Sequence, residues 1–192
     1  MKVEVNKKQI KIIEVGGFIM NKFKEIKPEE LNKNPFKLIG KNWMLITAKD
    51  DNKINTMTAS WGGFGVMFDK NVVYIVMRPQ RYTKKFVDNS DTFSLTFFDE
   101  TFRKKLIYIG SVSGRNEDKI SKANLTIQYL NNTPYFQEGN SAIICKKVYS
   151  QDFKSDGFIS NELDKNLYPE KDYPTLYIAE IEKIIIKEYW NK

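Results

Sequence analysis

The sequence predicts a mainly β fold in which about six strands form a barrel, with about three short helices inserted between them. Several segments alternate apolar and polar residues, which is typical of strands with one buried face. The helical patterns are short and do not alternate regularly with the strands, so a parallel βαβ arrangement is not favoured. At 192 residues the chain is long enough for one well-buried core, and we expect a single main domain.

The start of the chain reads as a lead-in to that domain. Residues 1–19 are predicted to be an extension that is not native, because Met20 opens a stretch that resembles a natural translation start. We therefore hypothesise that the domain is 20–192. The pattern at 26–31 predicts a short helix with Pro28 in its first turn.

A β-hairpin is predicted next. An extended approach at 34–36 leads to a strand at 43–48, a polar turn at 50–53 and a returning strand at 54–60. The glycines of 62–65 lack the spacing of a dinucleotide fingerprint, and no P-loop lysine follows them. Taken alone, they permit a bend or a bulge.

The middle of the chain predicts a buried strand followed by a short helix. Residues 72–77 form a nearly continuous apolar run, which favours a central position in the sheet. Tyr82, Phe86 and Val87 then fall at helical spacing, and the first helical turn lies near 80–83. Unpaired backbone amides at that turn favour an anion.

Hydroxyl and apolar residues alternate over 92–98, which predicts a strand with Ser94 and Thr96 on one face. That face meets either solvent or a site. Residues 101–109 predict an amphipathic helix, and 118–122 predict a brief helix.

Two more long strands are predicted at 141–150 and 175–187, the second with an irregularity. The polar connection at 151–173 carries scattered aromatic residues. Such a segment is suited to fold over a site or a partner subunit.

Composition limits the classes of function. The net charge is +7 and the sequence pI is about 9.2, but lysines are dispersed among acids, which indicates a solvated surface and not a nucleic-acid site. No apolar run is long enough for a membrane span. The single cysteine, Cys145, lies in an apolar run and favours a buried, inert thiol in a reducing, cytoplasmic setting.

The chain contains no histidine. Ser-His-Asp triads, His-paired cysteine nucleophiles and His-ligated zinc or iron sites are therefore excluded. We assign no catalytic side chain and no metal ligand. If the protein is an enzyme, we expect a cofactor to supply the reactive atom.

The stretch 55–83 carries the features of a ligand site. Small hydroxyl residues and glycines allow close approach of the backbone, while Trp61 and Tyr82 offer flat aromatic faces. Arg81 and Thr83 are suited to phosphate, although Arg81 as a surface charge and Thr83 as a helix cap are alternatives for this turn. A flat, phosphorylated ligand fits this pattern.

Five ordered motifs give the sequence a resemblance to a known family. They are Asn-Pro-Phe at 34–36, Asn-Trp-Met-Leu-Ile-Thr at 42–47, Asn-Thr-Met-Thr-Ala-Ser-Trp-Gly at 55–62, Arg-Pro-Gln-Arg-Tyr-Thr at 78–83 and Gly-Ser-Val-Ser-Gly-Arg at 110–115. In their order and spacing they resemble the flavin reductase-like, FMN-binding split-barrel family, which includes flavoredoxin-type proteins.

The resemblance implies an antiparallel Greek-key split β-barrel, a homodimer, and FMN held near the dimer interface. It also implies a set of residues that line the cofactor. They are Asn55, Thr58, Ala59, Ser60, Trp61, Arg78, Gln80, Arg81, Tyr82, Thr83, Ser94 and Lys119. The family often carries a histidine before its last strand, where this chain has Asp172-Tyr173-Pro174-Thr175.

Two activities are consistent with these implications. The first is an oxidoreductase that transfers a hydride from NAD(P)H to flavin and onward to an acceptor, a reaction that needs no protein acid, base or nucleophile. The second is an FMN electron carrier that never meets a nicotinamide and serves a redox protein partner. A third reading, an oligonucleotide-binding barrel, is disfavoured because aromatic residues such as Phe93 and Phe97 occupy apolar strand positions.

Overall fold

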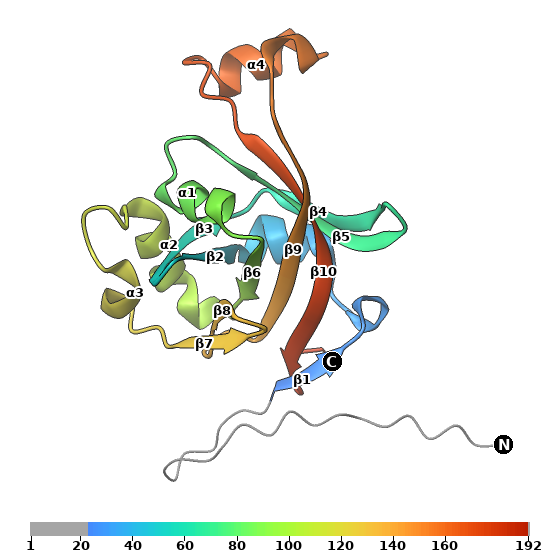
Figure 1. Cartoon of the computed structure of the whole chain (residues 1–192), viewed down its shortest axis with the longest axis vertical. Coiled ribbons are helices and arrows are strands. Elements are labelled where there is room, and N and C mark those ends of the chain that lie inside the picture. Colours follow the sequence, from blue (N-terminus) through green and yellow to red (C-terminus); the bar gives the residue numbers. More distant parts are fainter. Residues whose placement is uncertain (1–22, 192) are drawn as a thin grey trace, which may run out of the picture.

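The structure, a computed structural model, describes residues 23–191 (Figure 1). The proposed extension 1–19 and the start at Met20 lie outside the described residues. The strands are β1 Phe23–Ile26, β2 Met44–Asp50, β3 Lys53–Ala59, β4 Gly62–Met67, β5 Lys70–Met77, β6 Thr92–Phe97, β7 Ile127–Leu130, β8 Thr133–Phe136, β9 Ser141–Asp152 and β10 Thr175–Lys187. The helices are η1 Pro28–Glu30, η2 Phe36–Asn42, α1 Tyr82–Asn89, η3 Glu100–Phe102, α2 Arg103–Ser111, α3 Lys119–Lys122, η4 Ser155–Gly157 and α4 Asn161–Leu167.

One antiparallel sheet makes the barrel. Its strands follow the order β3-β2-β6-β9-β10-β5-β4, and β1 pairs with β10 beside that path. The two edge strands, β3 and β4, follow each other in the chain with only residues 60–61 between them. The sheet therefore curls round until its edges approach each other at this short link, as a split barrel does.

Apolar side chains fill the inside of the curled sheet. Phe93 and Leu95 of β6 pack there with Ile75 of β5 and Phe86 of α1, and all four are buried. A second apolar cluster lies under α2 and α3 and includes Leu106. The helices therefore cover the sheet with their apolar faces.

The structure confirms the main elements that the sequence predicts. The hairpin of β2 and β3, the helix α1 and the long strands β9 and β10 all form close to the predicted residues. The strand β5, predicted to be central, is an interior strand that pairs with β10 on one side and with β4 on the other. The predicted irregularity in the last strand corresponds to two register shifts against β9, one between Ile178 and Ala179 and one between Ile181 and Lys183.

Other expectations were wrong. The glycine-rich stretch is not a bend, because Gly62–Met67 pairs with β5 as a strand. Residues 36–42, expected to follow an extended approach, form a wide helix of π type. The hairpin of β7 and β8 and the helix α4 were not anticipated, because the two strands have only four residues each and the helix sequence is polar.

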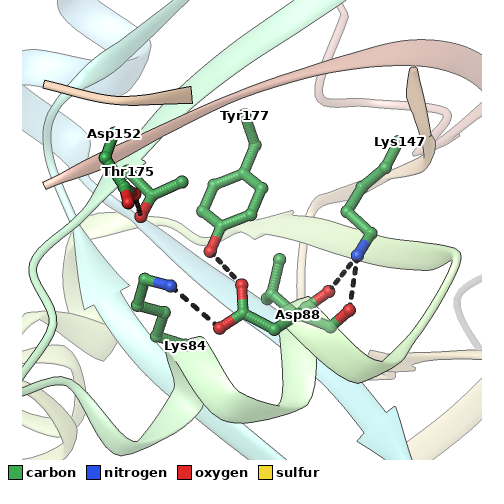
Figure 2. Close-up of polar contacts among 7 residues, drawn as sticks. Lys84, Asp88, Lys147, Asp152, Thr175 and Tyr177 are labelled. Carbon is green, nitrogen blue, oxygen red and sulfur yellow. Dashed lines mark hydrogen bonds and ion pairs between the residues drawn. The ribbon is translucent and has the colours of Figure 1, made fainter. Parts of the chain in front are cut away.

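Side chains from β9 and β10 fix the last turn of α1 to the sheet (Figure 2). Lys147 Nζ donates to the carbonyl oxygens of Val87 at 2.5 Å and Asp88 at 2.9 Å, and so satisfies the C-terminal end of the helix. The Asp88 carboxylate accepts from the Tyr177 hydroxyl and from Lys84 Nζ. The C-terminal end of α1 is thereby tied to β9 and β10.

Among residues 23–191, no helix has the length and apolar character needed to cross a membrane.

Candidate functional site

The first turn of α1 meets the edge strand β3 through a buried hydrogen bond. Thr83 Oγ1 donates to Asn55 Oδ1 at 2.8 Å, and the two side chains are 1% and 5% exposed. Both residues were predicted to contact the ligand from sequence positions 28 residues apart. The fold brings them together because α1 packs across β2 and β3.

The loop after α2 closes against the same pair. A Cβ atom at Gly114 would lie 2.0 Å from Asn55 Nδ2, so only glycine allows the loop backbone to approach the amide this closely. Thr58, also on β3, donates from Oγ1 to the Leu106 carbonyl of α2 at 2.6 Å. Strand, helix and loop therefore form one continuous wall.

A buried lysine lies beside this wall. Lys119 is 5% exposed, and its Nζ donates to the carbonyl oxygens of Ile109 at 3.1 Å and Val112 at 3.2 Å. Burial and, to a lesser degree, the nearby charge of Arg81 lower the pKa of Lys119 to about 8, while Glu117 opposes them. A buried ammonium group with a lowered pKa is a marker of functional sites.

Two arginines join the loop and the turn before α1 in a reciprocal way. Arg81 Nη1 donates to the Gly110 carbonyl at 3.2 Å, and Arg115 Nη1 donates to the Gln80 carbonyl at 3.3 Å. The Arg115 guanidinium also lies over the Tyr82 ring, 4.7 Å from its centroid. We call Arg81, Arg115 and Lys119 the cation cluster.

Within the part of the chain that the structure describes, the three side chains of the cation cluster form no ion pair. Glu117 is near enough to raise the pKa of Lys119, but it is itself paired with Lys122. In addition, no side chain caps the N-terminus of α1. Unpaired cations beside uncapped helix amides make a favourable place for an anion.

The end of β3 and the link to β4 hold three further predicted residues. Ala59 packs against the core, and Ser60 is half-buried. Trp61 is 47% exposed, and no hydrogen bond or ring contact within residues 23–191 joins it to Thr83 or Lys119. Beyond it, Gly62 has φ +151° and a Cβ there would lie 2.5 Å from the Tyr74 carbonyl oxygen, which explains the glycine.

Three predicted residues are engaged elsewhere. Arg78 Nη1 and Gln80 Nε2 both donate to Asp172 Oδ2, at 3.0 and 2.8 Å, so their side chains hold the segment before β10. Ser94 Oγ donates to the Pro134 carbonyl at 2.5 Å, because the unanticipated strand β8 covers that face of β6. Only the backbone carbonyl of Gln80 reaches the cation cluster.

The structure therefore unites Asn55, Thr58, Arg81, Tyr82, Thr83 and Lys119. The sequence analysis included Gly114 and Arg115 in the motif at 110–115 but did not assign them to the site. Their signal was the motif at 110–115, which ends in Gly-Arg.

Two open hollows lie away from these residues. One, of about 300 Å³, is lined by 151–154, 156–158 and Leu176, and the other, of about 360 Å³, by residues of the β2–β3 turn, the α1–β6 turn and the β7–β8 turn. Neither contains a predicted site residue. Within residues 23–191 there is no group of three potential metal ligands.

Comparison with known proteins identifies relatives of this arrangement. The sequence model of a family described as "flavin reductase like domain" matches residues 36–188. No curated protein matches the chain.

Similar solved structures share the fold. The FMN-binding domain of a flavin reductases-like enzyme from Shewanella baltica OS155 has a TM-score of 0.65 at 14% identity, over 88% of this chain and 80% of that one. Flavoredoxin from Methanosarcina acetivorans has a TM-score of 0.62 at 20% identity, with coverage of 77% and 69%. Flavoredoxin of Desulfovibrio vulgaris (Miyazaki F) has a TM-score of 0.60 at 23% identity, with coverage of 77% and 70%.

Proposed function

The chain belongs to the flavin reductase-like domain family, and from that premise we propose that it binds FMN and transfers a hydride from NAD(P)H to the flavin and onward to an acceptor. The observation that carries this proposal is the junction of α1, β3 and the loop after α2. There, Thr83, Arg81 and the buried Lys119 converge, and no ion pair among residues 23–191 includes either cation. Such a junction suits the phosphate end of a flavin mononucleotide.

The donor set fits a phosphate monoester. The ester carries about two negative charges at neutral pH and offers three acceptor oxygens. Arg81 and Lys119 supply two positive charges, and the Thr83 hydroxyl and the uncapped amides of α1 supply neutral donors. Each charge-assisted hydrogen bond is worth about 1.5 to 3 kcal/mol.

The flavin ring is assigned to the neighbouring edge strand. Because β3 lies at the edge of the sheet, alternate backbone N–H groups from Met57 to Ser60 lack a strand partner and are free to bind the ring. When bound, the flavin supplies an N5 atom that accepts a hydride. The protein positions the ring and excludes water, which is sufficient for a chain without histidine.

We further propose that two copies of the chain complete the site. Trp61 was expected to contact the flavin, yet it is 47% exposed at the link between β3 and β4. Exposed Val66 and Phe68 follow it on the hairpin of β4 and β5, which projects from the barrel in Figure 1. A homodimer that covers this apolar hairpin would enclose the Trp61 side chain.

A second candidate is an FMN electron carrier that serves a redox protein. It is supported by the shared fold with two flavoredoxins. The motif Asp172-Tyr173-Pro174-Thr175 lacks the histidine that the similar family often carries before its last strand.

Two measurements test these proposals. The absorption spectrum of the freshly purified protein should show the bands of oxidised flavin. Anaerobic mixing with NADH or NADPH should then bleach the flavin rapidly if the protein is a reductase. Flavin that is not bleached by either nucleotide, but is reduced by dithionite, would instead support the carrier, and a protein that does not bind FMN contradicts both.

A further inference from the structure

The cation cluster holds one more positive charge than the phosphate of FMN requires. A monoester carries about two negative charges, which Arg81 and Lys119 match. Arg115 is the third cation, and no carboxylate pairs with it among residues 23–191. This surplus suggests a second anionic group at the same junction.

Arg115 differs from Lys119 in its access to solvent. Lys119 is 5% exposed and held by two carbonyl oxygens, whereas Arg81 and Arg115 are both exposed. Of these two arginines, Arg115 also has its guanidinium over an aromatic ring, that of Tyr82. A buried cation suits an anion that stays bound, because the anion must replace the water that would otherwise solvate the positive charge. An exposed cation suits a ligand that arrives and leaves with each turnover.

The Arg115 side chain is already oriented. Its guanidinium lies over the Tyr82 ring at 4.7 Å, and a single Nη1 hydrogen bond to the Gln80 carbonyl fixes its rotation. The other N–H groups of the planar fork remain available for a bidentate contact with phosphate oxygens. Little side-chain entropy is then lost when the ligand binds.

We propose that Arg115 binds the pyrophosphate of the dinucleotide electron donor, with Tyr82 as the platform beneath its guanidinium. This inference rests on the proposed function, since it assigns the donor's place at the same junction. A pyrophosphate offers two adjacent anionic groups, which the guanidinium fork matches in shape and charge.

The test is equilibrium binding of NAD⁺, NADP⁺ and ADP-ribose to the FMN-loaded protein by calorimetry. Arg115→Gln should weaken binding of the dinucleotide that the wild type prefers, and of ADP-ribose, by about tenfold, and Arg115→Lys should restore part of the loss. The matched control is Arg103→Gln. Arg103 also lies over an aromatic ring, that of Trp43 at 4.2 Å, and donates to a backbone carbonyl, but outside the site.

FAD carries the same pyrophosphate, so the apoprotein is also titrated with FMN and FAD. Arg115→Gln should leave FMN affinity within about twofold of the wild type. A loss of FAD affinity with unchanged NAD⁺ and NADP⁺ binding would assign Arg115 to the flavin and overturn the proposal. Equal binding of the dinucleotides by variant and wild type, or no binding by the wild type, would overturn it as well.

These outcomes are distinct from failure of the proposed function. If the wild type binds NADH or NADPH but its flavin is not bleached, the reductase proposal fails while the binding role of Arg115 stands. If the flavin is bleached with the same dependence on donor concentration in Arg115→Gln, the reductase stands and the role of Arg115 is refuted.

Discussion

Thr83 Oγ1 and Asn55 Oδ1 lie 2.8 Å apart in a buried contact between the first turn of α1 and an edge strand of the sheet. This bond fixes the Asn55 amide so that its Nδ2 faces the backbone of Gly114. One hydroxyl group therefore orders two of the three segments that meet at the candidate site.

Replacing Thr83 with valine should weaken both stability and FMN binding. The variant keeps the side-chain volume but leaves the buried Asn55 Oδ1 without its donor, a loss of about 1 to 3 kcal/mol in the free energy of unfolding. FMN affinity should fall further when Lys119→Ala is added. Urea unfolding and fluorescence titration measure the two effects.

Thr101→Val is the control, because Thr101 carries an exposed hydroxyl outside the site. Unchanged FMN affinity in the double variant of Thr83 and Lys119 would remove both residues from the phosphate contact.

A methyl group at Gly114 should disturb the site without disturbing the core. In Gly114→Ala the new Cβ would start 2.0 Å from Asn55 Nδ2, so either the loop or the amide must move. We expect FMN to bind at least about fivefold more weakly, which corresponds to a loss of about 1 kcal/mol in binding free energy. Gly157→Ala is the matched control, since a Cβ there meets nothing within 4 Å. Equal FMN affinity in the two variants would show that the loop does not contact the ligand.

The sequence predicts the parts of the site that depend on local patterns. The turn before α1 is recognisable from its own residues, Thr83 ends the motif at 78–83, and Lys119 comes from the resemblance to the family. Side chains whose partners come from distant or unanticipated segments were not predictable. Arg78 and Ser94 are examples, because they donate their hydrogen bonds to Asp172 and to the Pro134 carbonyl.

The same limit applies to the fold. The strand β4 has a glycine-rich sequence with low β-propensity, and its pairing with β5 is a tertiary effect that no short window reveals. The hairpin of β7 and β8 is short and polar at its turn, where Asn131 and Asn132 adopt positive φ. Long strands such as β10 were predictable because their consecutive buried residues, as at Ile184–Ile186, require an apolar run.

Loss of the clamp on α1 should destabilise the fold. Lys147→Met keeps the apolar stem but removes the donor to the Val87 and Asp88 carbonyl oxygens, which should cost about 1 kcal/mol of unfolding free energy. Lys146→Met is the control, because Lys146 is the neighbouring residue in the chain and its side chain is exposed. Urea denaturation of both variants compares the two effects, and equal midpoints would mean that the clamp contributes nothing.

Asp172→Ala should loosen the segment that precedes β10. The carboxylate accepts hydrogen bonds from both Arg78 and Gln80. Its removal therefore breaks the hydrogen bonds that hold this segment to the residues after β5. We expect limited proteolysis within 153–173 to become several-fold faster. Asp156→Ala is the control, since Asp156 is exposed in the same segment. Identical cleavage rates for the two variants would contradict a role of Asp172 in holding the segment.

FMN affinity should depend on pH through Lys119. Burial lowers the pKa of this lysine to about 8 from an ordinary value of 10.5, so the folded protein loses the proton before the unfolded chain does. Without ligand, stability therefore increases as pH rises from about 8 towards 10.5, since the unfolded state binds more protons there. A bound phosphate favours the charged form and raises the pKa again. FMN affinity should consequently be constant below about pH 8 and fall by up to about tenfold per pH unit above it.

Fluorescence titration with FMN and with riboflavin, from pH 6.5 to 9.5, separates this effect from others. Riboflavin lacks the phosphate, so its affinity should not follow the protonation of Lys119. Lys119→Arg, whose guanidinium stays charged throughout this range, should bind FMN with a flat pH profile. A parallel fall for riboflavin, or the same fall in Lys119→Arg, would show that another group controls binding. The lysine ammonium would then not be the phosphate contact. A lysine that contacts the phosphate makes the affinity for FMN depend on its protonation, but not the affinity for riboflavin.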